Sequence, residues 1–218
     1  MSDTLPTEVV PIEVETAADF AVATGADESV ISDLQQYRSY LEEWNQKMNL
    51  VGPSTLEVFW SRHAWDSAQI LPLAPEALTW ADLGAGAGLP GIVLAILQKN
   101  RPGFHIHLVE SMAKRCRFLT EVVTGLNLPA TIHNSRAEDL SLTVDIVTAR
   151  ACAPMTRLLG YAQPYLKRGA TALFLKGQDV AAEMEEAAKS WTFEAEVLPS
   201  FSDARGRIVR VRKLRRGR

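Results

Sequence analysis

A cluster of glycines near the middle of the chain carries the strongest chemical signal. Gly84, Gly86 and Gly88 stand at alternate positions in the segment Asp82–Gly91, where an apolar run ends and a helical pattern begins. Glycine adopts positive φ without penalty and lets the backbone approach a ligand closely. The free N–H groups at the start of the next helix face the same crevice, which is where open α/β sheets bind ligands. The segment therefore predicts a ligand-binding turn between a strand and a helix.

An acidic residue, Glu110, ends the next apolar run, Phe104 to Val109. An acid at the end of the second strand is well placed to accept hydrogen bonds from ribose hydroxyls. The glycine turn and Glu110 together therefore indicate a cofactor that contains a nucleoside. The alternative is a tight turn beside a surface glutamate.

The same glycines are also compatible with an enzyme that binds a dinucleotide cofactor. Gly86, Gly88 and Gly91 satisfy the pattern G-x-G-x-x-G, and Glu110 follows near the expected spacing of about 20 residues. However, Pro90 removes one N–H donor from the helix start, which would weaken pyrophosphate binding. The turn also comes late in the chain, and nothing resembles a separate substrate domain. We therefore disfavour a dehydrogenase.

Charge is distributed unevenly along the chain, whose net charge is -3. Residues 1–36 contain eight acids and no Lys or Arg, whereas residues 205–218 contain eight bases and no acid. Such a dense group of bases indicates either contact with a polyanion such as RNA or a solvated, solubilising end. Arg215 and Arg216 are the candidates for RNA contact within this group.

Other polar residues are expected around the same crevice. Arg150 should end the fourth strand, where its guanidinium could bind a cofactor carboxylate or a substrate phosphate, or else form a salt bridge. Lys176, at the end of the fifth strand, could contact RNA likewise. His63 and Asp66 are three residues apart, so they could form a general base with its orienting acid or a structural pair on a helix. Arg62 could contact RNA or an acidic neighbour.

Metal and disulfide chemistry have little support. Neither Cys116 nor Cys152 lies in a CxxC or His-rich spacing, which favours a protein of the reducing cytosol. His105 and His107 alternate along a predicted strand and look more like half-exposed strand positions than a metal pair, so we predict no metal. The sequence lacks a basic and apolar leader and has no apolar run near the roughly 18 residues of a membrane span. We therefore expect neither export nor membrane insertion.

The sequence pattern divides the chain into four parts. Residues 1–15 are acidic, carry two prolines and lack a helical period, so we expect a flexible arm. Residues 16–75 form a helical extension. Residues 76–214 alternate between strand and helix patterns, and residues 215–218 form a basic tail.

The alternation after residue 76 predicts an α/β fold with a seven-stranded, mostly parallel sheet and helices on both faces. The expected strands lie near residues 78–83, 104–110, 130–134, 144–149, 170–176, 192–198 and 207–213. The expected helices lie near residues 90–99, 112–126, 153–165 and 179–190. In the extension, apolar residues at every third or fourth position predict an amphipathic helix from Asp27 to about Met48. A second helix should run from Ser54 through His63.

The chain resembles the RsmG (GidB) family, whose members methylate N7 of a guanine in bacterial small-subunit ribosomal RNA. The resemblance lies in short motifs that follow one another in order over roughly residues 35–180. They are the glycine segment with Leu89-Pro90-Gly91 and the segments Trp44–Leu50, Arg62–Ser67, Leu108–Ser111, Lys114–Arg115, Ser135–Asp139, Ala149–Ala151 and Leu175–Gly177. One departure is Cys152, where the family tends to have Phe.

The resemblance implies a Rossmann-like class I methyltransferase fold and S-adenosyl-L-methionine as the cofactor. Family contacts to this cofactor map here onto Gly84, Leu89, Ala137, Glu138 and Arg150. Glu110 stands at the general class position for the ribose. Cys152 could suggest a covalent nucleophile, but a small buried thiol is the better interpretation because no Pro-Cys pair accompanies it.

We therefore expect a cytosolic, monomeric enzyme whose partner is ribosomal RNA, the small ribosomal subunit or its precursor. Guanine N7 carries a lone pair and no proton, so direct in-line displacement needs neither a base nor a covalent intermediate. Other RNA, protein or small-molecule substrates remain open, because a fold does not select a substrate. A non-enzymatic RNA-binding module is a further alternative, which would leave the glycine turn and Glu110 unexplained.

Overall fold

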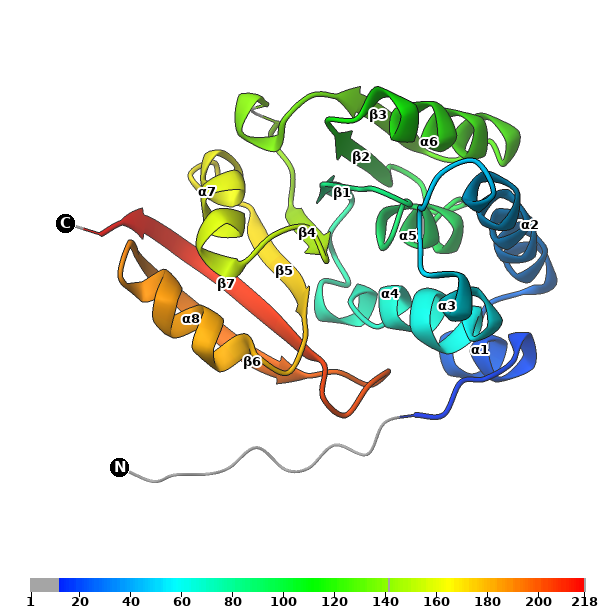
Figure 1. Cartoon of the computed structure of the whole chain (residues 1–218), viewed down its shortest axis with the longest axis horizontal. Helices are drawn as coiled ribbons and strands as arrows, with labels where there is room; N and C mark the ends of the chain where they lie inside the picture. Colours follow the sequence, from blue (N-terminus) through cyan, green and yellow to red (C-terminus); the bar gives the residue numbers. More distant parts are fainter. Residues whose placement is uncertain (1–11, 141, 218) are drawn as a thin grey trace.

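The computed structural model describes residues 12–140 and 142–217 of the chain. An N-terminal helical part precedes a single large sheet (Figure 1). The helical part comprises α1 (Ala17–Thr24), α2 (Glu28–Asn45), α3 (Pro53–Glu57), the π-helix η1 (Trp60–Trp65), α4 (Asp66–Ala68) and the short 3-10 helix η2 (Leu71–Leu73).

The sheet has seven strands in the order β3-β2-β1-β4-β5-β7-β6, which confirms the predicted fold class. Its strands are β1 (Thr79–Leu83), β2 (His105–Glu110), β3 (Ala130–Asn134), β4 (Ile146–Arg150), β5 (Thr171–Lys176), β6 (Trp191–Pro199) and β7 (Arg207–Arg216). The strands from β1 to β5 are parallel, and β7 runs antiparallel to both of its neighbours, β5 and β6. The strand order reverses between β1 and β4, so a crevice opens at their carboxyl ends.

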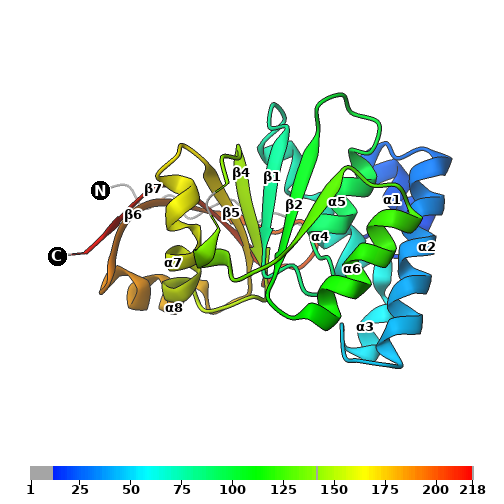
Figure 2. The same ribbon diagram turned by 90° about the horizontal axis from the view of Figure 1, so that it is seen from above.

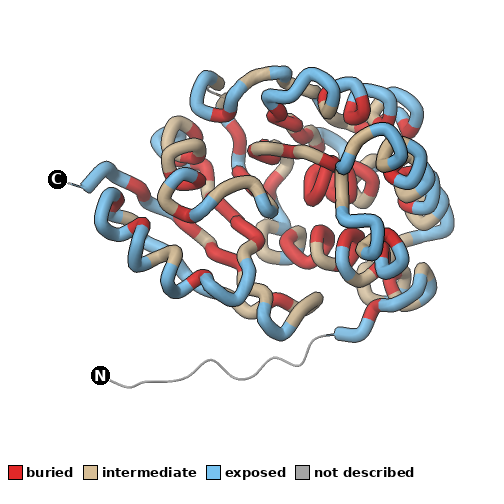
Figure 3. The backbone as a smooth tube through the Cα atoms, in the orientation of Figure 1, coloured by how far each residue is buried: buried red, intermediate tan, exposed pale blue. Residues whose placement is uncertain are grey.

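Helices cover both faces of the sheet (Figure 2). The connecting helices are α5 (Gly91–Leu97), α6 (Ala113–Gly125), η3 (Ala137–Asp139), α7 (Met155–Leu166) and α8 (Val180–Ala188). Side chains alternate between the faces along each strand, so Trp80 packs with the N-terminal helices, α5 and α6, whereas Ala81 packs with α7 and α8. Figure 3 shows buried residues on the strands in the middle of the molecule.

The helical extension packs firmly against the sheet domain. Helix α2 begins after Asp27, whose carboxylate accepts a hydrogen bond from the Val30 N–H, and it buries Leu34, Tyr37 and Leu41 along one face. This spacing is the one that predicted the helix. The helix ends at Asn45, earlier than expected, because the Asn45 side chain accepts the N–H groups of Leu50 and Val51 and turns the chain.

The predicted N-terminal arm and the predicted C-terminal tail both differ from the structure where it describes them. Most of the predicted arm, residues 1–11, lies outside the described residues. The remainder is packed, since Val14 is 2% exposed and the Ile12 N–H donates to the Phe201 carbonyl at 3.0 Å. At the other end, Arg215 and Arg216 are not tail residues. They belong to β7, paired with Thr192 and Trp191 of β6.

Among the described residues, no helix combines the length and the apolar character needed to cross a membrane.

Candidate active site

Each glycine of the turn after β1 has its own reason to lack a side chain. All three adopt positive φ, at 70° for Gly84, 56° for Gly86 and 85° for Gly88. A Cβ on Gly84 would lie 2.4 Å from the Cys152 Sγ, and one on Gly88 would lie 2.3 Å from the Ile92 Cγ1. A Cβ on Gly86 would meet only the Gly84 carbonyl oxygen, at 3.7 Å. Gly86 is therefore the glycine whose missing side chain keeps space open.

Glu110 holds this turn in place. Its side chain is buried, and Oε2 accepts the Gly86 N–H at 3.0 Å while Oε1 accepts the Met112 N–H at 2.8 Å. The Arg115 guanidinium lies 3.7 Å from Oε2. Tyr37 of α2 supports the turn from the other side, because its hydroxyl donates to the Ala87 carbonyl at 2.5 Å. The helical extension thus helps to fix the shape of the glycine turn.

A cavity of about 830 Å³ opens at the carboxyl ends of β1, β2 and β4. Seven of the eight predicted cofactor residues line it, namely Gly84, Gly86, Leu89, Glu110, Ala137, Glu138 and Arg150. Gly88 does not line the cavity, since its close neighbours are Ile92 and Leu119. We assign Gly88 to the packing of the turn on α5 and α6.

The cavity also contains residues that the sequence analysis did not assign to it. They are Leu50, Val51, Ala85, Ala87, Val109, Ser111, Arg115, Asn134, Ser135, Arg136, Asp139, Ala151, Cys152 and Tyr161. Several of them belong to the family motifs quoted above. The motifs therefore could have pointed to these residues, although they assigned no role to each one. Burial raises the pKa of the Cys152 thiol to about 11, which keeps it protonated near neutral pH and disfavours a nucleophilic role.

Asp82, directly beneath the turn, is a further residue that was missed. It is fully buried, and Oδ2 accepts the Gly91 N–H at the start of α5 at 2.9 Å. Burial raises the pKa of its carboxyl to about 7, and Oδ1 has no hydrogen-bond partner among the residues that the structure describes. An unpaired buried carboxylate oxygen is costly. The Asp82 carboxyl can therefore ionise near neutral pH, and a nearby cation would stabilise its negative charge.

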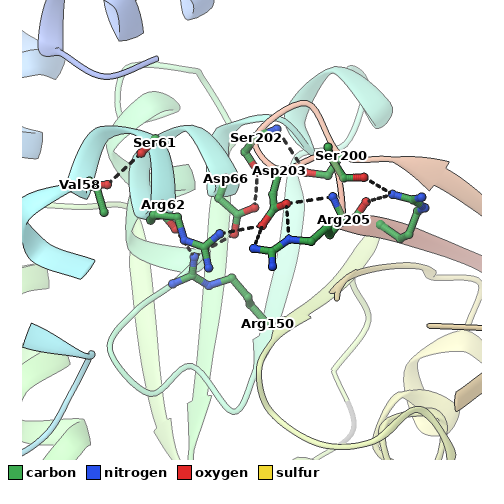
Figure 4. Close-up of polar contacts among 12 residues, drawn as sticks. Val58, Ser61, Arg62, Asp66, Arg150, Ser200, Ser202, Asp203 and Arg205 are labelled. Carbon is green, nitrogen blue, oxygen red and sulfur yellow. Dashed lines mark hydrogen bonds and ion pairs between the residues drawn. The ribbon is translucent and has the colours of Figure 1, made fainter. Parts of the chain in front are cut away.

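Arg150 stands at the junction of the sheet and the helical extension (Figure 4). Its Nη1 donates to Asp66 Oδ2 at 2.9 Å and to the Arg62 carbonyl at 2.8 Å. Its Nη2 lies 3.1 Å from His63 Nδ1. The salt bridge considered for Arg150 thus forms, and Arg150 is also among the residues that line the cavity.

His63 and Asp66 both contact Arg150. His63 is 5% exposed, and its Nε2 lies 2.9 Å from Thr55 Oγ1. Burial, together with the charges of Arg150 and Arg62, lowers the pKa of His63 to about 3. A neutral imidazole can accept from Arg150 at Nδ1 and donate to Thr55 at Nε2. His63 is therefore a buried support for Arg150, and it has little surface to offer to RNA.

A second cavity, of about 450 Å³, shares Arg150 and Ala151 with the first. Five cations and two acids line it: Arg62, Arg150, Lys176, Arg205, Arg207, Asp66 and Asp203. Lys176 Nζ lies 2.6 Å from Glu183 Oε2 and 3.2 Å from the Ala153 carbonyl. Of the RNA candidates, Arg62, His63 and Lys176 thus meet at one cavity.

Arg215 and Arg216 lie away from both cavities. Strand β7 begins beside the second cavity at Arg207 and ends at Arg216, roughly 30 Å away at about 3.3 Å per residue. The Arg216 guanidinium carbon lies 5.9 Å from the centroid of the Trp191 ring. Arg215 and Arg216 belong to the basic C-terminal group, but the structure does not place them near the site.

The histidines of β2 contact one another and β3. His107 Nδ1 lies 2.9 Å from His133 Nε2, and His105 Nε2 lies 2.9 Å from Thr131 Oγ1. His105 and His107 are both half-buried. These contacts provide a structural account of the alternating histidines in the sequence.

Comparison with solved structures identifies the fold. The O-methyltransferase TomG from Streptomyces achromogenes, in complex with S-adenosylmethionine, matches with a TM-score of 0.57 and 13% identity over 89% of this chain and 94% of that chain. A mutant of MtNAS in complex with S-adenosylmethionine matches with a TM-score of 0.56 and 15% identity over 90% of this chain and 83% of that chain. These likenesses show the fold, which the chain shares with two structures that hold S-adenosylmethionine.

Sequence comparison identifies the family to which the chain belongs. The family profile "GidB: rRNA small subunit methyltransferase G" matches residues 30–209. The Ribosomal RNA small subunit methyltransferase G of Caulobacter vibrioides is 62% identical over 210 residues, which cover 96% of this chain and 97% of that protein. The protein of the same name from Bradyrhizobium sp. is 46% identical over 213 residues, covering 94% and 96%. The chain belongs to the GidB family, which confirms the resemblance, the enzyme class and the predicted cofactor.

Proposed function

We propose that this enzyme transfers a methyl group to N7 of a guanine in small-subunit ribosomal RNA. The observation that carries the proposal is the shared wall of the two cavities. The first is lined by the glycine turn and Glu110, and the second is rich in cations. Arg150 and Ala151 belong to both, so a base in the second cavity would lie next to a methyl donor in the first. The relatives' names support ribosomal RNA as the polyanion.

The residues present fit S-adenosylmethionine. Gly86 keeps space open above the turn, and Glu110 offers a carboxylate at the cavity wall. Buried Asp82 lies beneath the turn, and its carboxyl, whose pKa burial raises to about 7, would be stabilised in its ionised form by a cationic ligand. We infer that Gly84, Gly86, Leu89, Glu110, Ala137 and Glu138 hold this donor, whose sulfonium supplies an activated methyl group when bound.

The protein's own task is alignment. Guanine N7 already has a lone pair, so no side chain has to remove a proton from it. His63 is buried and neutral, and burial keeps the Cys152 thiol protonated. Arg150 is fixed by three contacts from the helical extension, which suits a group that positions a ligand. We therefore propose direct in-line displacement without a catalytic base or a covalent intermediate.

The test of the substrate is transfer of labelled methyl from S-adenosylmethionine to small ribosomal subunits that carry unmodified RNA. Large subunits, protein-free small-subunit RNA and bulk protein serve as parallel acceptors. We expect label in the small-subunit RNA, either in the particle or in the protein-free RNA. Label confined to large subunits or to protein would contradict the proposal.

We further propose that the enzyme works as a monomer in the cytosol. Light scattering across a range of protein concentrations should give the mass of one chain. A stable mass of two chains would contradict this part of the proposal.

A further inference from the structure

The loop between β6 and β7 carries an acid that contacts two arginines at the rim of the second cavity. Asp203 Oδ2 accepts a hydrogen bond from Arg62 Nη1 at 2.8 Å, and Oδ1 accepts the Arg205 N–H at 2.9 Å. The Arg205 guanidinium lies against the same carboxylate, with Nε at 3.4 Å from Oδ1 and Nη2 at 3.5 Å from Oδ2. Figure 4 shows Asp203 joined by dashed lines to both arginines.

We propose that Asp203 is a positioning residue that holds Arg62 and Arg205 as a pair for binding an RNA phosphate next to the target base. This inference rests on the proposed function. It gives a role to Asp203 and Arg205, to which the proposed function assigns none. The pair is called the arginine clamp below.

Charge and exposure favour an external anion over an internal ion pair. The side chains of Arg62 and Arg205 are 50% and 71% exposed, whereas that of Asp203 is 24% exposed. One carboxylate cannot neutralise two guanidinium groups, so the clamp keeps a net positive charge that faces solvent. Guanidinium groups bind phosphate oxygens through charge-assisted hydrogen bonds. The exposed part of the clamp therefore suits a phosphate.

The clamp is also preorganised. The loop is closed by a hydrogen bond from the Gly206 N–H to the Asp203 carbonyl at 2.8 Å, and Arg207 Nη1 donates to the Ala204 carbonyl at 2.8 Å. A Cβ on Gly206 would lie 2.9 Å from the Ser200 Cβ, so the loop is tightly packed there. Fixing donors before binding lowers the entropy lost when a ligand binds.

The same loop is docked on the helices that hold Arg150. Ser202 Oγ donates to Asp66 Oδ1 at 2.6 Å, and the Trp65 Nε1–H donates to the Phe201 carbonyl at 3.2 Å. Asp66 in turn contacts Arg150 at the wall shared by the two cavities. A phosphate at the clamp would therefore be held in a fixed relation to a base beside Arg150.

A substitution at Asp203 separates this role from general electrostatic attraction. Asp203→Asn raises the net charge by one, so diffuse attraction alone would make RNA binding tighter. The clamp predicts the opposite, because the two arginines would repel each other and lose their common anchor. Arg62→Gln and Arg205→Gln remove one exposed guanidinium each and should leave the fold intact. Glu194→Gln, which breaks an exposed ion pair between Glu194 of β6 and Lys213 of β7, is the matched control for the acid.

The experiment measures binding of unmodified small ribosomal subunits to the full chain at several salt concentrations, with S-adenosylhomocysteine present. Because a charge-assisted hydrogen bond is at stake, we expect Arg62→Gln and Arg205→Gln each to weaken binding by roughly tenfold. The slope of log affinity against log salt should fall by about 0.7 for each lost phosphate contact. Asp203→Asn should also weaken binding, while Glu194→Gln should not.

Thermal unfolding and calorimetry with S-adenosylmethionine show whether each variant is folded and binds the donor. If Asp203→Asn does not fold, the two arginine variants carry the test. Tighter binding by Asp203→Asn, or unchanged affinity and salt slope in both arginine variants, would overturn the clamp. The proposed function fails separately, if the wild-type chain places the methyl group on another atom or another substrate, because the clamp is measured by binding alone.

Discussion

Gly86 follows β1, and Glu110 ends the neighbouring strand β2. The Gly86 N–H donates a hydrogen bond to the Glu110 carboxylate, and this contact shapes the donor cavity. The Glu110 carboxylate also accepts the Met112 N–H, so one side chain fixes the backbone after β1 and after β2. A carboxylate held by two backbone N–H groups is well oriented before any ligand arrives. Residues of the cavity wall thus serve both the fold and the donor site.

Substitution of Gly86 tests the donor cavity directly. Gly86→Val places a branched side chain where the backbone has φ of 56° and where space is now open. We expect at least tenfold weaker binding of S-adenosylmethionine by calorimetry, a loss of about 1.4 kcal/mol or more. Gly25→Val is the matched control, because Gly25 also has positive φ and open space but lies at the end of α1. Equal affinity of the wild type and Gly86→Val would contradict the assignment.

The absence of a catalytic base is testable through Arg150, His63 and Cys152. His63→Ala and Cys152→Ala should each keep the single-turnover rate within roughly tenfold, whereas loss of a general acid or base costs about 100-fold or more. Arg150→Ala should lower the rate on the order of 100-fold, because misplacement near the reacting atoms is costly.

The same rates measured from about pH 6 to pH 9 should show no titration of His63, whose pKa lies near 3. A titration near neutral pH that His63→Ala abolishes would contradict direct attack. Trapping of a covalent RNA adduct through Cys152 would contradict it equally.

Asp82 makes a prediction about stability and pH. In the folded chain burial raises the pKa of its carboxyl from 3.8 to about 7. Below about pH 4 both the folded and the unfolded states carry the proton, so Asp82 has no effect on the pH dependence there. Between about pH 4 and pH 7 the unfolded state releases the proton first, so this residue makes the folded state progressively less stable as pH rises.

Asp82→Asn cannot ionise and retains an oxygen that can accept the Gly91 N–H. Its unfolding free energy in urea, relative to the wild type, should therefore increase as pH rises from about 4 to 7 and then level off. A difference between the two proteins that does not change with pH would show that Asp82 is not held protonated by the fold.

At the scale of elements, β1, β2, β4 and β5 were predictable because each centres on a short apolar run. Strand β7 is mostly basic, and it ends at Arg216, three residues beyond the predicted end. Strand β3 lies at the predicted residues 130–134, and β5 begins one residue later than predicted. The helix predicted from Ser54 through His63 is divided into α3, which ends at Glu57, and the π-helix Trp60–Trp65. The π-type hydrogen-bond pattern was not predicted, because it departs from the 3.6-residue period that reveals helices. Helix α1 lies in the predicted helical extension but was not predicted as a separate element, since Phe20 is its single buried residue and the alanines around it give little periodicity.

The candidate site divides in the same way. The donor cavity was largely predictable because the glycine turn, Glu110 and the later motifs are local signals at strand ends. The second cavity was predicted only in part: its lining includes the candidates Arg62, His63, Arg150 and Lys176, but the loop residues Ser200 and Asp203 were not among the candidates. Asp203 and Arg205 acquire a role only when the loop of β6 and β7 docks on the helical extension. No local pattern in the sequence carries that contact.

Helix α2 is predicted to stabilise the glycine turn through Tyr37. Tyr37→Phe removes the hydrogen bond to the Ala87 carbonyl and leaves that buried oxygen without its donor. We expect the unfolding free energy to fall by about 1 to 3 kcal/mol, the usual cost of an unsatisfied buried polar group. Chemical denaturation measures this loss, and Tyr40→Phe, from a half-buried tyrosine of the same helix, is the control. No loss of stability in Tyr37→Phe would show that the helix supports the turn by packing alone.

At the scale of the whole molecule, the helical extension and the loop between β6 and β7 meet at the carboxyl ends of the strands (Figure 1). They enclose the second cavity against β4 and β5, beside the donor cavity. The net charge is -3, yet five cations converge on this one cavity. The distribution of charge, and not its sum, is what suits the molecule to RNA.

The most direct test of the account is the position of the transferred methyl group. N7-methylation gives guanine a fixed positive charge, which makes the base labile after borohydride reduction, so aniline cleaves the RNA chain there. Small-subunit RNA should be treated in this way after reaction with S-adenosylmethionine and either the wild type or Gly86→Val. The account predicts one enzyme-dependent cleavage, at a guanine, that the variant strongly reduces at limiting donor. Methyl label in the RNA without any such cleavage, or on an exocyclic amine, would contradict it.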